Sequence, residues 1–399
     1  MGPLGGRPAG VSVDAAPSQR PSVQGPAVEA YFENLLPDNR EIRQRIAERF
    51  HTDRADAFSL LAEIGRDCVG ALQILPDGER PEAPGTRHRR PLTEEEVEAH
   101  LQSMSGRPAF GVSDDDSFRI SLAGAQERTA LCRHADRWRL PQGGTPTTHI
   151  FKLPMARRPQ NIDRSTSIEN EWLCHKLLQA YGVPVANADI LRFGGTTALC
   201  VERFDRKHSS SGGILRRPRE DICQVFALGP SRKYEKDGGP GIRHIMDFLS
   251  GSLHARPDPL DFFRIRLVFW LLAAIDDHAE NLSIFIQPRG SFQLAPRYDV
   301  LSAHPVLGHG TGFIAPQMAE MSMAVWGKNR HAKWAEIRRE HFEKTAADCG
   351  IGNPGPLIDD IKAMTPGIVE RVARDLPPTF PDHVAGTILK GVSATARKL

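Results

Sequence analysis

The sequence of 399 residues lacks long apolar runs, and it has few cysteines and no excess of charge of either sign. No stretch approaches the ~20 consecutive apolar residues that cross a bilayer, and the amino terminus has no apolar segment typical of a secretory signal. The six cysteines are scattered, without a CxxC pair or a Cys/His ligand spacing, which disfavours a structural zinc site and predicts reduced thiols in a core. We therefore expect a soluble, cytoplasmic protein with no membrane partner.

The charge balance and a missing nucleotide-binding motif narrow the function further. The formal net charge is only +2 at pH 7, which is not the electrostatic footprint of a dedicated nucleic-acid binder. The sequence contains no GKS or GKT, so it has no Walker A loop. Its hydrophobic fraction of 40% and charged fraction of 25% are typical of a globular chain, with length for two or three domains.

The first part of the chain is expected to be a disordered segment followed by a helical region. Residues 1–26 carry five Gly and five Pro without periodicity, which is typical of disorder. Asp38 or Asn39 can cap a helix whose apolar residues recur every fourth position from Ile42. The elements predicted next are a helix at 55–64, a strand at 69–75, a linker at 76–91 and a helix opened by a capping box of Thr93 with Glu96.

The middle of the chain changes to short strands, and the remainder is mainly helical. Residues 117–204 alternate apolar and polar positions around one helix that starts near Ser167, which fits a kinase amino-terminal lobe and other α+β domains alike. An apolar stretch at 261–275 predicts a buried central helix. Two short strands are predicted after it, at 282–286 and 292–294.

The strongest chemical signal is the segment AIDDHAEN, in which Asp276 is followed by Asn281 five residues later and by Asp299 after 23 residues. Phosphoryl transfer requires a carboxylate to orient the attacking hydroxyl, a few oxygen ligands for Mg²⁺ and cations on the phosphates. This spacing is that of a kinase catalytic loop and its metal-binding aspartate. The alternative is that Asp276 and Asp277 only cap the apolar helix and that His278 is a surface group, although acidic residues at a helix carboxyl end oppose the helix dipole.

Three further segments have a nucleotide-binding interpretation and a plain structural one. SLAGAQERTA, residues 121–130, places small residues between predicted strands, where backbone N–H groups can approach phosphates, but an ordinary hairpin has the same pattern. Lys152 lies in an apolar strand, where it either pairs with the α- and β-phosphates or faces solvent. The backbone of VERFDR, residues 201–206, either binds adenine or belongs to an edge strand that runs into a linker.

These segments, with several others, resemble the ordered signature segments of the HipA family of serine/threonine-protein kinase toxins. The segments are SLAGAQE, PTTHIFKLP, ENEW, VERFDR, KYE…GGPG and AAIDDHAEN…LAPRYDVLS, and the upstream AVEAYFENLLPDNREIRQRI is similar to the family's amino-terminal domain. Their order and spacing match over roughly residues 27–399, which is far more specific than any single motif. The resemblance implies an α+β, protein-kinase-like fold of two lobes, with a β-rich amino-terminal lobe and an all-helical carboxy-terminal lobe.

The resemblance also implies a domain order. The expected units are a disordered or aberrant amino terminus at 1–26, a remnant of the family's amino-terminal domain at 27–110, a kinase-like amino-terminal lobe with the phosphate loop at 111–218, and a helical carboxy-terminal lobe with the catalytic loop at 219–399. The family's first β-rich subdomain is not recognisable in residues 1–26, so we expect either a shifted start or reading frame or a shortened form. Its loss would expose apolar surface around Tyr31, Phe32, Leu35 and Leu36.

The residue roles that the resemblance implies involve two cofactors, ATP and Mg²⁺. Asp276 would be the catalytic base, and Asn281 and Asp299 would hold Mg²⁺. The residues expected to contact ATP are Ala123, Gly124, Ala125, Gln126, Glu127 and Arg128 of the phosphate loop, Lys152, the adenine-binding Glu202, Arg203 and Phe204, and His278, Asn281, Tyr298 and Asp299. Ser121 would be the family's autophosphorylated serine, whose phosphate adds about −2 charge beside the nucleotide and switches the kinase off. The plainer interpretation of Ser121 is a packed hydroxyl.

The function implied is ATP-dependent phosphorylation of a protein serine or threonine by the toxin of a toxin–antitoxin system. The expected substrate is an aminoacyl-tRNA synthetase, glutamyl-tRNA synthetase in particular, whose inhibition would stop translation. The expected partner is a HipB-like helix-turn-helix antitoxin, through which the chain would reach operator DNA indirectly. Two alternatives stay open: an inactive kinase-fold co-repressor scaffold in an antitoxin–DNA complex, and a small-molecule kinase.

Three positions depart from the family pattern. Arg128 stands where Lys is usual, which keeps the charge but changes the donor geometry. Asp277 replaces a common Gly, and Glu280 replaces a common Lys. We expect Asp277 to add charge beside Asp276 and to perturb the pKa of that base.

Overall fold

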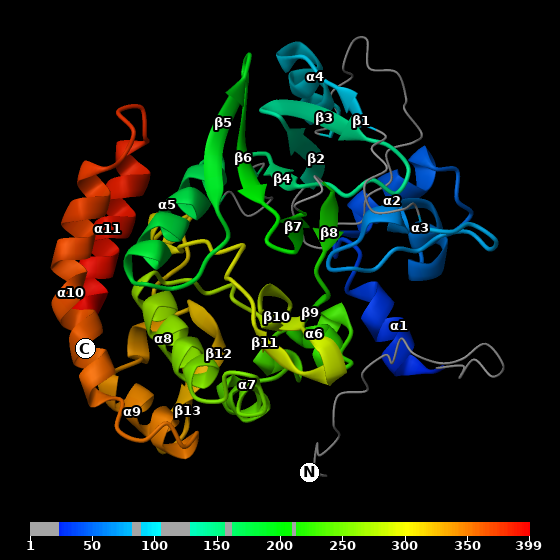
Figure 1. Ribbon diagram of the computed structural model, residues 1–399. Helices are drawn as coiled ribbons and strands as arrows, with labels where there is room; N and C mark the ends of the chain where they lie inside the picture. Colours follow the sequence, from blue (N-terminus) through cyan, green and yellow to red (C-terminus); the bar gives the residue numbers. More distant parts are fainter. Residues whose placement is uncertain (1–23, 82–88, 105–127, 156–161, 210–212) are drawn as a thin grey trace.

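The computed structural model describes residues 24–81, 89–104, 128–155, 162–209 and 213–399. In this part of the chain a small helical unit, a strand-rich lobe and a larger, mainly helical lobe adjoin one another (Figure 1). The strand-rich lobe lies at the top of that view and the larger lobe below it, while the last two helices run along one side.

The helical unit contains α1 (Pro26–Glu33), α2 (Arg40–Arg49) and α3 (Ala57–Ile64). The predicted cap of α2 is confirmed, because Asn39 Oδ1 accepts hydrogen bonds from the backbone N–H groups of Glu41 and Ile42, at 2.8 and 3.4 Å. Helix α1 begins at Pro26, and residues 1–23 of the segment expected to be disordered lie outside the described residues.

The apolar surface expected around Tyr31, Phe32, Leu35 and Leu36 is not exposed. Leu35 and Leu36 are 1% and 0% exposed, and Tyr31 and Phe32 are half-buried. The two leucines pack in a core with residues of α2 and α3, and Gln224 Nε2 of the larger lobe donates a hydrogen bond to the Tyr31 carbonyl at 3.3 Å. The expectation is wrong because this face is covered by the neighbouring helices and by the larger lobe.

The strand predicted at 69–75 is also wrong. This segment is a loop that follows a 3₁₀ turn, Gly65–Asp67. The backbone of Gly70 bonds to side chains instead of to a neighbouring strand: its N–H donates to Asp205 Oδ2 at 2.7 Å, and its carbonyl accepts from Arg206 Nη1 at 2.7 Å, while the Ile74 N–H donates to the Gly65 carbonyl at 2.8 Å. The apolar pattern therefore reflected burial and not sheet pairing.

The strand-rich lobe is an antiparallel sheet of six strands in the order β1-β3-β2-β4-β6-β5. The strands are β1 (Arg89–Pro91), β2 (Arg128–His134), β3 (Arg137–Pro141), β4 (His149–Lys152), β5 (Ala188–Phe193) and β6 (Thr196–Glu202). In this register Lys152 at the end of β4 stands opposite Arg128 on β2 and opposite Leu199 on β6. The sheet thus brings Arg128 and Lys152 to one edge.

Helix α4 (Glu94–Met104) packs on this sheet and opens with the predicted capping box. Glu96 Oε2 accepts from the Thr93 N–H at 2.8 Å, and Thr93 Oγ1 accepts from the Glu96 N–H at 3.2 Å. Because β1 pairs with β3, the segment that carries β1 and α4 shares a sheet with strands beyond the boundary expected at residue 110. The domain limits themselves stay a prediction.

The larger lobe is built on α8 (Pro257–Leu271), which is buried along most of its length, as predicted from the apolar stretch at 261–275. The other helices of this lobe are α6 (Ile222–Val225), α7 (Ile242–Leu249), α9 (Arg339–Asp348), α10 (Gly355–Arg374) and α11 (Asp382–Ala396). Helix α5 (Ser167–Ala180), the predicted helix of the upper lobe, contacts β5 and β6 on one side and α10 and α11 on the other. It therefore joins the two lobes.

The larger lobe is not all helical, which corrects the sequence-based expectation. Besides the two predicted strands it contains β9, which pairs with β10, and a hairpin of β12 and β13; β7 and β8 pair in the preceding linker. The bounds are β7 (Arg206–His208), β8 (Ile214–Arg216), β9 (Arg219–Asp221), β10 (Ser283–Ile286), β11 (Phe292–Leu294), β12 (Glu320–Trp326) and β13 (Arg330–Lys333). The sequence of β12, EMSMAVW, was missed because a short run of Met and Ala fits a helix as well as a strand.

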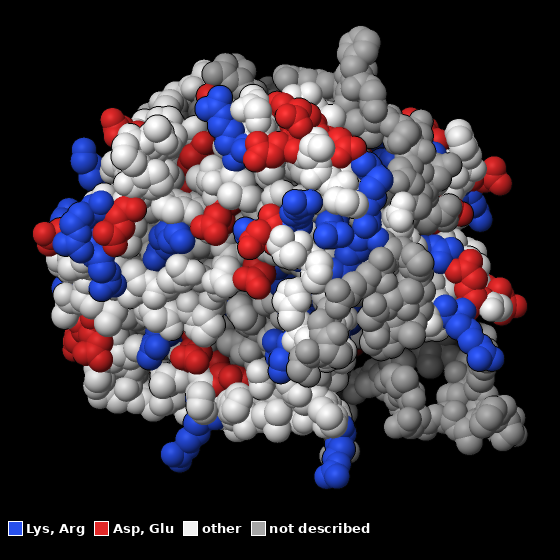
Figure 2. Space-filling view, turned by 45° about the horizontal axis from the view of Figure 1, so that its top comes forward, with Lys and Arg blue, Asp and Glu red and all other residues white. Residues whose placement is uncertain are grey.

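All six cysteines are free, and five of them are buried, as predicted. Within the described ranges, no helix has both the length and the apolar character needed to cross a bilayer. On the face shown in Figure 2, acidic and basic side chains are interspersed, in keeping with the small net charge.

Candidate active site

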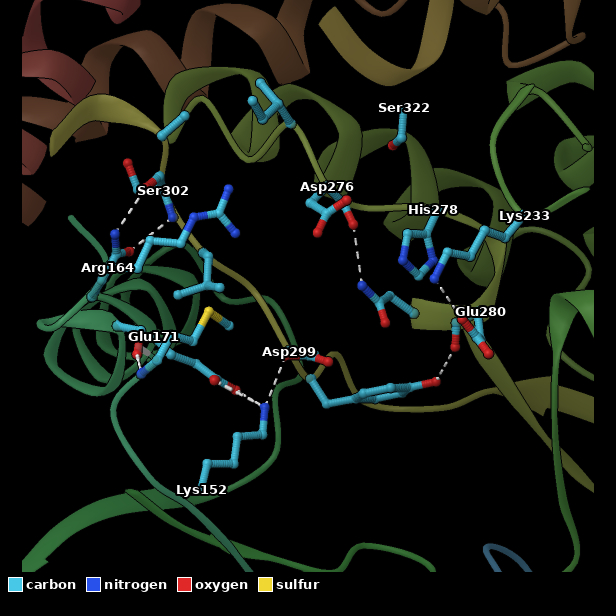
Figure 3. A pocket seen from close by; sticks show the side chains of 18 of the residues that line it. Lys152, Arg164, Glu171, Lys233, Asp276, His278, Glu280, Asp299, Ser302 and Ser322 are labelled. Atoms are coloured by element: carbon cyan, nitrogen blue, oxygen red, sulfur yellow. Dashed lines mark hydrogen bonds and ion pairs between the residues drawn. The ribbon is translucent and has the colours of Figure 1, made fainter. Parts of the chain in front are cut away.

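A cavity of about 640 Å³ lies between the two lobes and is lined by side chains of both. Lys152 and Glu171 come from the upper lobe, and Asp276 and Asp299 come from the larger lobe (Figure 3). Three of these four residues were predicted from the sequence, although Lys152 and Asp299 are separated by 147 positions. The fold thus brings the predicted catalytic-loop and phosphate-binding segments to one place.

Lys152 is buried and forms two ion pairs. Its Nζ lies 2.6 and 2.9 Å from the two carboxylate oxygens of Glu171 on α5, and 2.8 Å from Asp299 Oδ1. Burial raises the pKa of Glu171, and the ammonium of Lys152 opposes that shift. The solvent-facing alternative for Lys152 is therefore wrong.

Asp299 lies between two cations. Arg128 Nη2 is 2.5 Å from Asp299 Oδ2, while Lys152 holds the other oxygen. Burial opposes ionisation of this carboxyl, but the charges of Arg128 and Lys152 outweigh it and lower the pKa of Asp299. Asp299 also has a positive φ of 59°, which is uncommon outside glycine and directs its side chain into the cavity wall.

Asp276 follows α8 at the mouth of the cavity. Its carboxylate accepts a hydrogen bond from the Tyr234 hydroxyl, and its backbone carbonyl accepts from Asn281 Nδ2 at 3.1 Å. The side chain is solvent-exposed, yet the protein packed around it raises its pKa by desolvation, an effect that the Tyr234 hydrogen bond and Lys233 partly oppose. A carboxylate open to solvent and held by a neighbouring side chain has the placement that a general base requires.

Asp277 does not face the cavity, so the expected perturbation of the base by this residue is wrong. Its carboxylate forms an ion pair with Arg266, a residue of α8, and both side chains are buried. The charge of Asp277 is thereby compensated in the core. The interpretation of Asp276 and Asp277 as helix caps is also wrong. The carboxylate of Asp276 accepts a hydrogen bond from Tyr234, and that of Asp277 pairs with Arg266.

His278 and Glu280 lie behind the predicted base. His278 is 5% exposed, its ring centroid is 4.9 Å from that of Tyr234, and burial lowers its pKa to about 3, so it is neutral at pH 7. Glu280 is 6% exposed and lies 3.2 Å from Lys233 Nζ, which also pairs with Asp38 of the helical unit. Burial, together with the charge of Asp38, raises the pKa of Glu280 to about 7, and Lys233 opposes this shift.

The predicted adenine segment, Glu202–Phe204, lines the cavity at the junction of the lobes. The side chain of Arg203 is engaged in a buried network with Asp67 and Asp205, at 3.2 and 2.9 Å. Arg203 can therefore offer only backbone groups to a nucleotide. Phe204 packs against Tyr298, with ring centroids 5.6 Å apart and ring planes tilted by 35°.

Tyr298 lines the cavity, but its hydroxyl is directed into the larger lobe. The hydroxyl lies 2.5 Å from both Ser283 Oγ and Arg219 Nη2, and it donates to the Glu280 carbonyl at 2.9 Å. These bonds hold the chain on the amino-terminal side of Asp299 in place. Only the ring of Tyr298 is left to meet a ligand.

Part of the predicted phosphate loop cannot be placed. Ser121, Ala123, Gly124, Ala125, Gln126 and Glu127 lie outside the described residues. Arg128, the last residue of that segment, begins β2 and reaches Asp299. The structure therefore describes one member of the loop.

Sequence reasoning missed several cavity residues. Glu171 lies in the ENEW segment, and an acidic residue on the apolar face of a helix that follows a strand lysine was the available signal. Lys233 and Tyr234 lie in the KYE segment, to which no role had been given. Asp38 was predicted only as a possible helix cap, and the structure assigns that cap to Asn39.

The residues present fit a magnesium ion that binds together with a nucleotide. Asp299 is held ionised, and Asn281 uses its Nδ2 in a hydrogen bond, which leaves its amide oxygen for another partner. Mg²⁺ takes one or two protein oxygens and completes its shell with phosphates and water. Within the described part of the chain, no group of three or more His, Cys, Asp or Glu side chains is arranged to hold a metal alone.

The comparison with protein families gives two matches. The model named HipA-like C-terminal domain matches residues 120–378, and the model named HipA N-terminal domain matches residues 7–75, so the second match begins inside the segment expected to be disordered. Together they span most of the chain.

Curated relatives agree with these matches. The "Putative kinase Y4mE" of Sinorhizobium fredii is 31% identical over 375 residues, covering 89% of this chain and 83% of that protein. The serine/threonine-protein kinase toxin HipA of Shewanella oneidensis is 31% identical over 288 residues, covering 69% of this chain and 63% of that protein. The second match thus spans less than two thirds of the toxin's length.

A solved structure agrees in fold. The Shewanella oneidensis HipA chain, determined in a complex with HipB and its operator DNA, superposes with a TM-score of 0.74 at 24% identity, covering 93% of this chain and 85% of that one. The two-lobed architecture expected from the sequence is thereby confirmed, apart from the additional strands of the larger lobe. On the family matches and the relatives, the chain belongs to the HipA family of serine/threonine-protein kinases.

Proposed function

We propose that this chain transfers the γ-phosphoryl group of Mg²⁺-ATP to a protein serine or threonine and acts as the toxin of a toxin–antitoxin system. The observation that carries the proposal is the meeting of Lys152, Asp276, Asn281 and Asp299 in one cavity between the lobes. An inactive scaffold of the same fold would have no need of the buried Lys152–Glu171 pair, whose desolvation is costly. A kinase uses such a lysine on the nucleotide phosphates.

The proposed chemistry assigns one task to each residue. Asp276 orients the acceptor hydroxyl and accepts its proton as the hydroxyl oxygen bonds to the γ-phosphorus, while the bond from this phosphorus to the bridging oxygen breaks and ADP leaves. Lys152 and Arg128 move from Asp299 to the phosphate oxygens, so the cations that now stabilise Asp299 balance the charge of the nucleotide. Asn281 and Asp299 would hold Mg²⁺, and the ion would supply positive charge to the nucleotide phosphates. The backbone of Glu202–Phe204 would meet adenine.

The phosphate loop and Ser121 belong to the same proposal. Residues 123–127 would cover the phosphates, since they directly precede Arg128 at the cavity. Ser121 would accept a phosphate from the chain's own site and so switch the kinase off. Incubation with Mg²⁺-ATP, followed by intact-mass and peptide analysis, should find one phosphate on Ser121; a phosphate found only at other positions would remove this regulatory claim.

The proposed partners rest on the relatives. The solved relative is a complex of HipA with HipB and operator DNA, which supports a HipB-like helix-turn-helix antitoxin and indirect contact with DNA for this chain. The proposed substrate is an aminoacyl-tRNA synthetase of the glutamyl-tRNA synthetase type.

The test of the kinase is Asp276→Asn, with Asp375→Asn at the exposed end of α10 as the matched control. Radiolabelled Mg²⁺-ATP is mixed with the protein alone and with glutamyl-tRNA synthetase. Label should enter protein with the wild type and the control only, while Mg²⁺-ATP affinity stays within a few fold in both variants, because the base acts in the transition state. Undiminished labelling by Asp276→Asn would refute the assignment of the base, and binding of Mg²⁺-ATP by the wild type without label on either protein would favour a scaffold or a small-molecule kinase.

A further inference from the structure

The KYE…GGPG segment is the signature motif to which the kinase chemistry gives no role. It runs over the catalytic loop, and the Ala279 N–H donates to the Lys233 carbonyl at 3.1 Å. Lys233, Tyr234 and Lys236 all line the cavity that contains Asp276. The segment therefore lies where an acceptor must approach the base.

The residues on either side of Tyr234 are anchored. Lys233 Nζ pairs with Asp38 of the helical unit and with Glu280 of the catalytic loop. Glu235 Oε2 accepts from the Ala324 N–H of β12 at 2.6 Å and pairs with Arg330 of β13 at 3.2 Å. The backbone on both sides of Tyr234 is thus fixed to three different parts of the molecule.

Two glycines allow the segment to turn tightly after these anchors. A Cβ at Gly239 would collide with the Arg232 carbonyl and would lie 2.8 Å from the Tyr234 carbonyl. A Cβ at Gly241 would lie 2.5 Å from Glu235 Oε1. The chain therefore requires glycine at both places to hold Tyr234 and Glu235 where they are.

Tyr234 itself is half-buried and reaches the base. Its hydroxyl donates to Asp276 Oδ1, and its ring makes an edge contact with His278 at 4.9 Å between centroids. Burial and the neighbouring Asp276 raise the pKa of Tyr234, so the hydroxyl keeps its proton and acts as the donor. Within the described ranges, no other hydrogen bond to the Asp276 carboxylate is found.

An acceptor serine or threonine must make the same contact. A general base takes a proton from a hydroxyl within hydrogen-bond distance, and in a kinase that hydroxyl belongs to the acceptor. The Tyr234 hydroxyl already has this position and this polarity. Because the tyrosine side chain lies at the cavity mouth between two anchored residues, it can rotate away without moving the backbone.

We propose that Tyr234 occupies the acceptor-hydroxyl position on Asp276 Oδ1 and denies this one position to water until a protein acceptor displaces the tyrosine. Tyr234 is thus a specificity-determining residue that favours transfer to protein over hydrolysis of ATP. The inference rests on the proposed kinase function, since it takes Asp276 as the base.

The test is Tyr234→Phe, which keeps the ring contact with His278 and removes the hydroxyl. The matched control is Tyr181→Phe, which removes a buried hydroxyl bonded to Thr365 Oγ1 at 2.8 Å, away from the cavity. ATP hydrolysis by the full-length protein is measured with Mg²⁺ and without protein acceptor, together with Mg²⁺-ATP affinity. Tyr234→Phe should raise hydrolysis by about tenfold, the lower range for one hydrogen bond to a charged group, and Tyr181→Phe should equal the wild type.

Each other outcome has a definite meaning. A fall in hydrolysis with Tyr234→Phe would mean that the hydroxyl orients Asp276, and an unchanged rate would mean that it only packs; both overturn the proposal. The double variant Asp276→Asn/Tyr234→Phe must lose the increase, since a rate that stays high would not come from the base. If the wild type does not bind Mg²⁺-ATP, the proposed kinase function is wrong. If the wild type binds Mg²⁺-ATP but Tyr234→Phe does not raise hydrolysis, only the proposal for Tyr234 is wrong.

Discussion

Lys152 and Glu171 form a buried ion pair that joins strand β4 to helix α5, with Nζ 2.6 Å from Oε1 and 2.9 Å from Oε2. The same ammonium lies 2.8 Å from Asp299 Oδ1, so a single cation links a strand, a helix and the loop after β11. Since both partners are desolvated, their relative position is held far more firmly than that of a surface pair. The upper lobe thereby carries its helix in the arrangement that a working kinase requires.

Glu171→Gln should lower single-turnover phosphoryl transfer by about a hundredfold, the scale on which one preorganised electrostatic contact acts. The amide cannot balance the charge of Lys152, which then pairs with Asp299 alone and is less free to bind phosphate. The control is Glu169→Gln, which changes the same residue type in the first turn of the same helix, outside the cavity lining. Equal rates for the two variants would mean that the Lys152–Glu171 pair has no part in transfer.

Asp299→Asn should weaken binding of Mg²⁺-ATP by tenfold or more, because a neutral amide is a poorer ligand for a hard cation. Binding of ATP in the presence of a chelator should be unchanged or tighter, since the variant removes a negative charge from beside the phosphates. Calorimetric titrations with and without Mg²⁺ separate the two effects. If both affinities fell alike, Asp299 would serve the nucleotide and not the metal.

Glu280→Gln should change the pH dependence of stability. The pKa of Glu280 is raised to about 7 in the folded protein, whereas in the unfolded chain it is near 4.5. Between these two pH values the carboxyl is protonated in the folded state and ionised in the unfolded state, so the wild type loses stability as the pH rises from 4.5 to 7. The glutamine variant lacks this loss, so its stability relative to the wild type should rise over that range by at most about 3 kcal/mol. Urea unfolding without nucleotide at pH 5 and 7.5 measures the change, with the exposed Glu336→Gln as control. A difference that is the same at both pH values would show that Glu280 titrates normally.

Asp67→Asn should destabilise the protein by roughly 3–5 kcal/mol, because it leaves Arg203 and Arg206 with Asp205 as their shared counter-charge. Asp67 is 2% exposed and pairs with Arg203, Arg206 and Arg216, at 3.2, 2.9 and 3.1 Å. The control is Asp136→Asn, whose exposed pair with Arg133 at 3.5 Å is worth under about 1 kcal/mol. Chemical denaturation followed by fluorescence is the measurement, and a loss as small as that of the control would mean that water enters the network.

Much of the local structure could be predicted from the sequence, because its signals act over a few residues. The cap at Asn39, the capping box of Thr93 with Glu96 and the buried helix α8 each depend on neighbours within one or two turns. The strand at 69–75 failed for the opposite reason, since its backbone partners, Asp205 and Arg206, are more than a hundred residues away.

The same distinction between local signals and distant contacts applies to the candidate site. The sequence by itself determined which residues are candidates for kinase chemistry, since Lys152, Asp276, Asn281 and Asp299 stand in recognisable local segments in a recognisable order. Their catalytic roles stay predictions until the variants are measured.

Only the tertiary structure decided what surrounds these residues. It turned Asp277 away to Arg266, paired Lys152 with Glu171, and set the Tyr234 hydroxyl on Asp276. Partners of this kind are chosen by burial: a charge taken out of water is stable only beside a counter-charge or a hydrogen-bond donor that the fold delivers from elsewhere in the chain. The sequence shows the spacing of residues within a motif, but the partners of a buried charge come from segments that only the folded structure brings close to it.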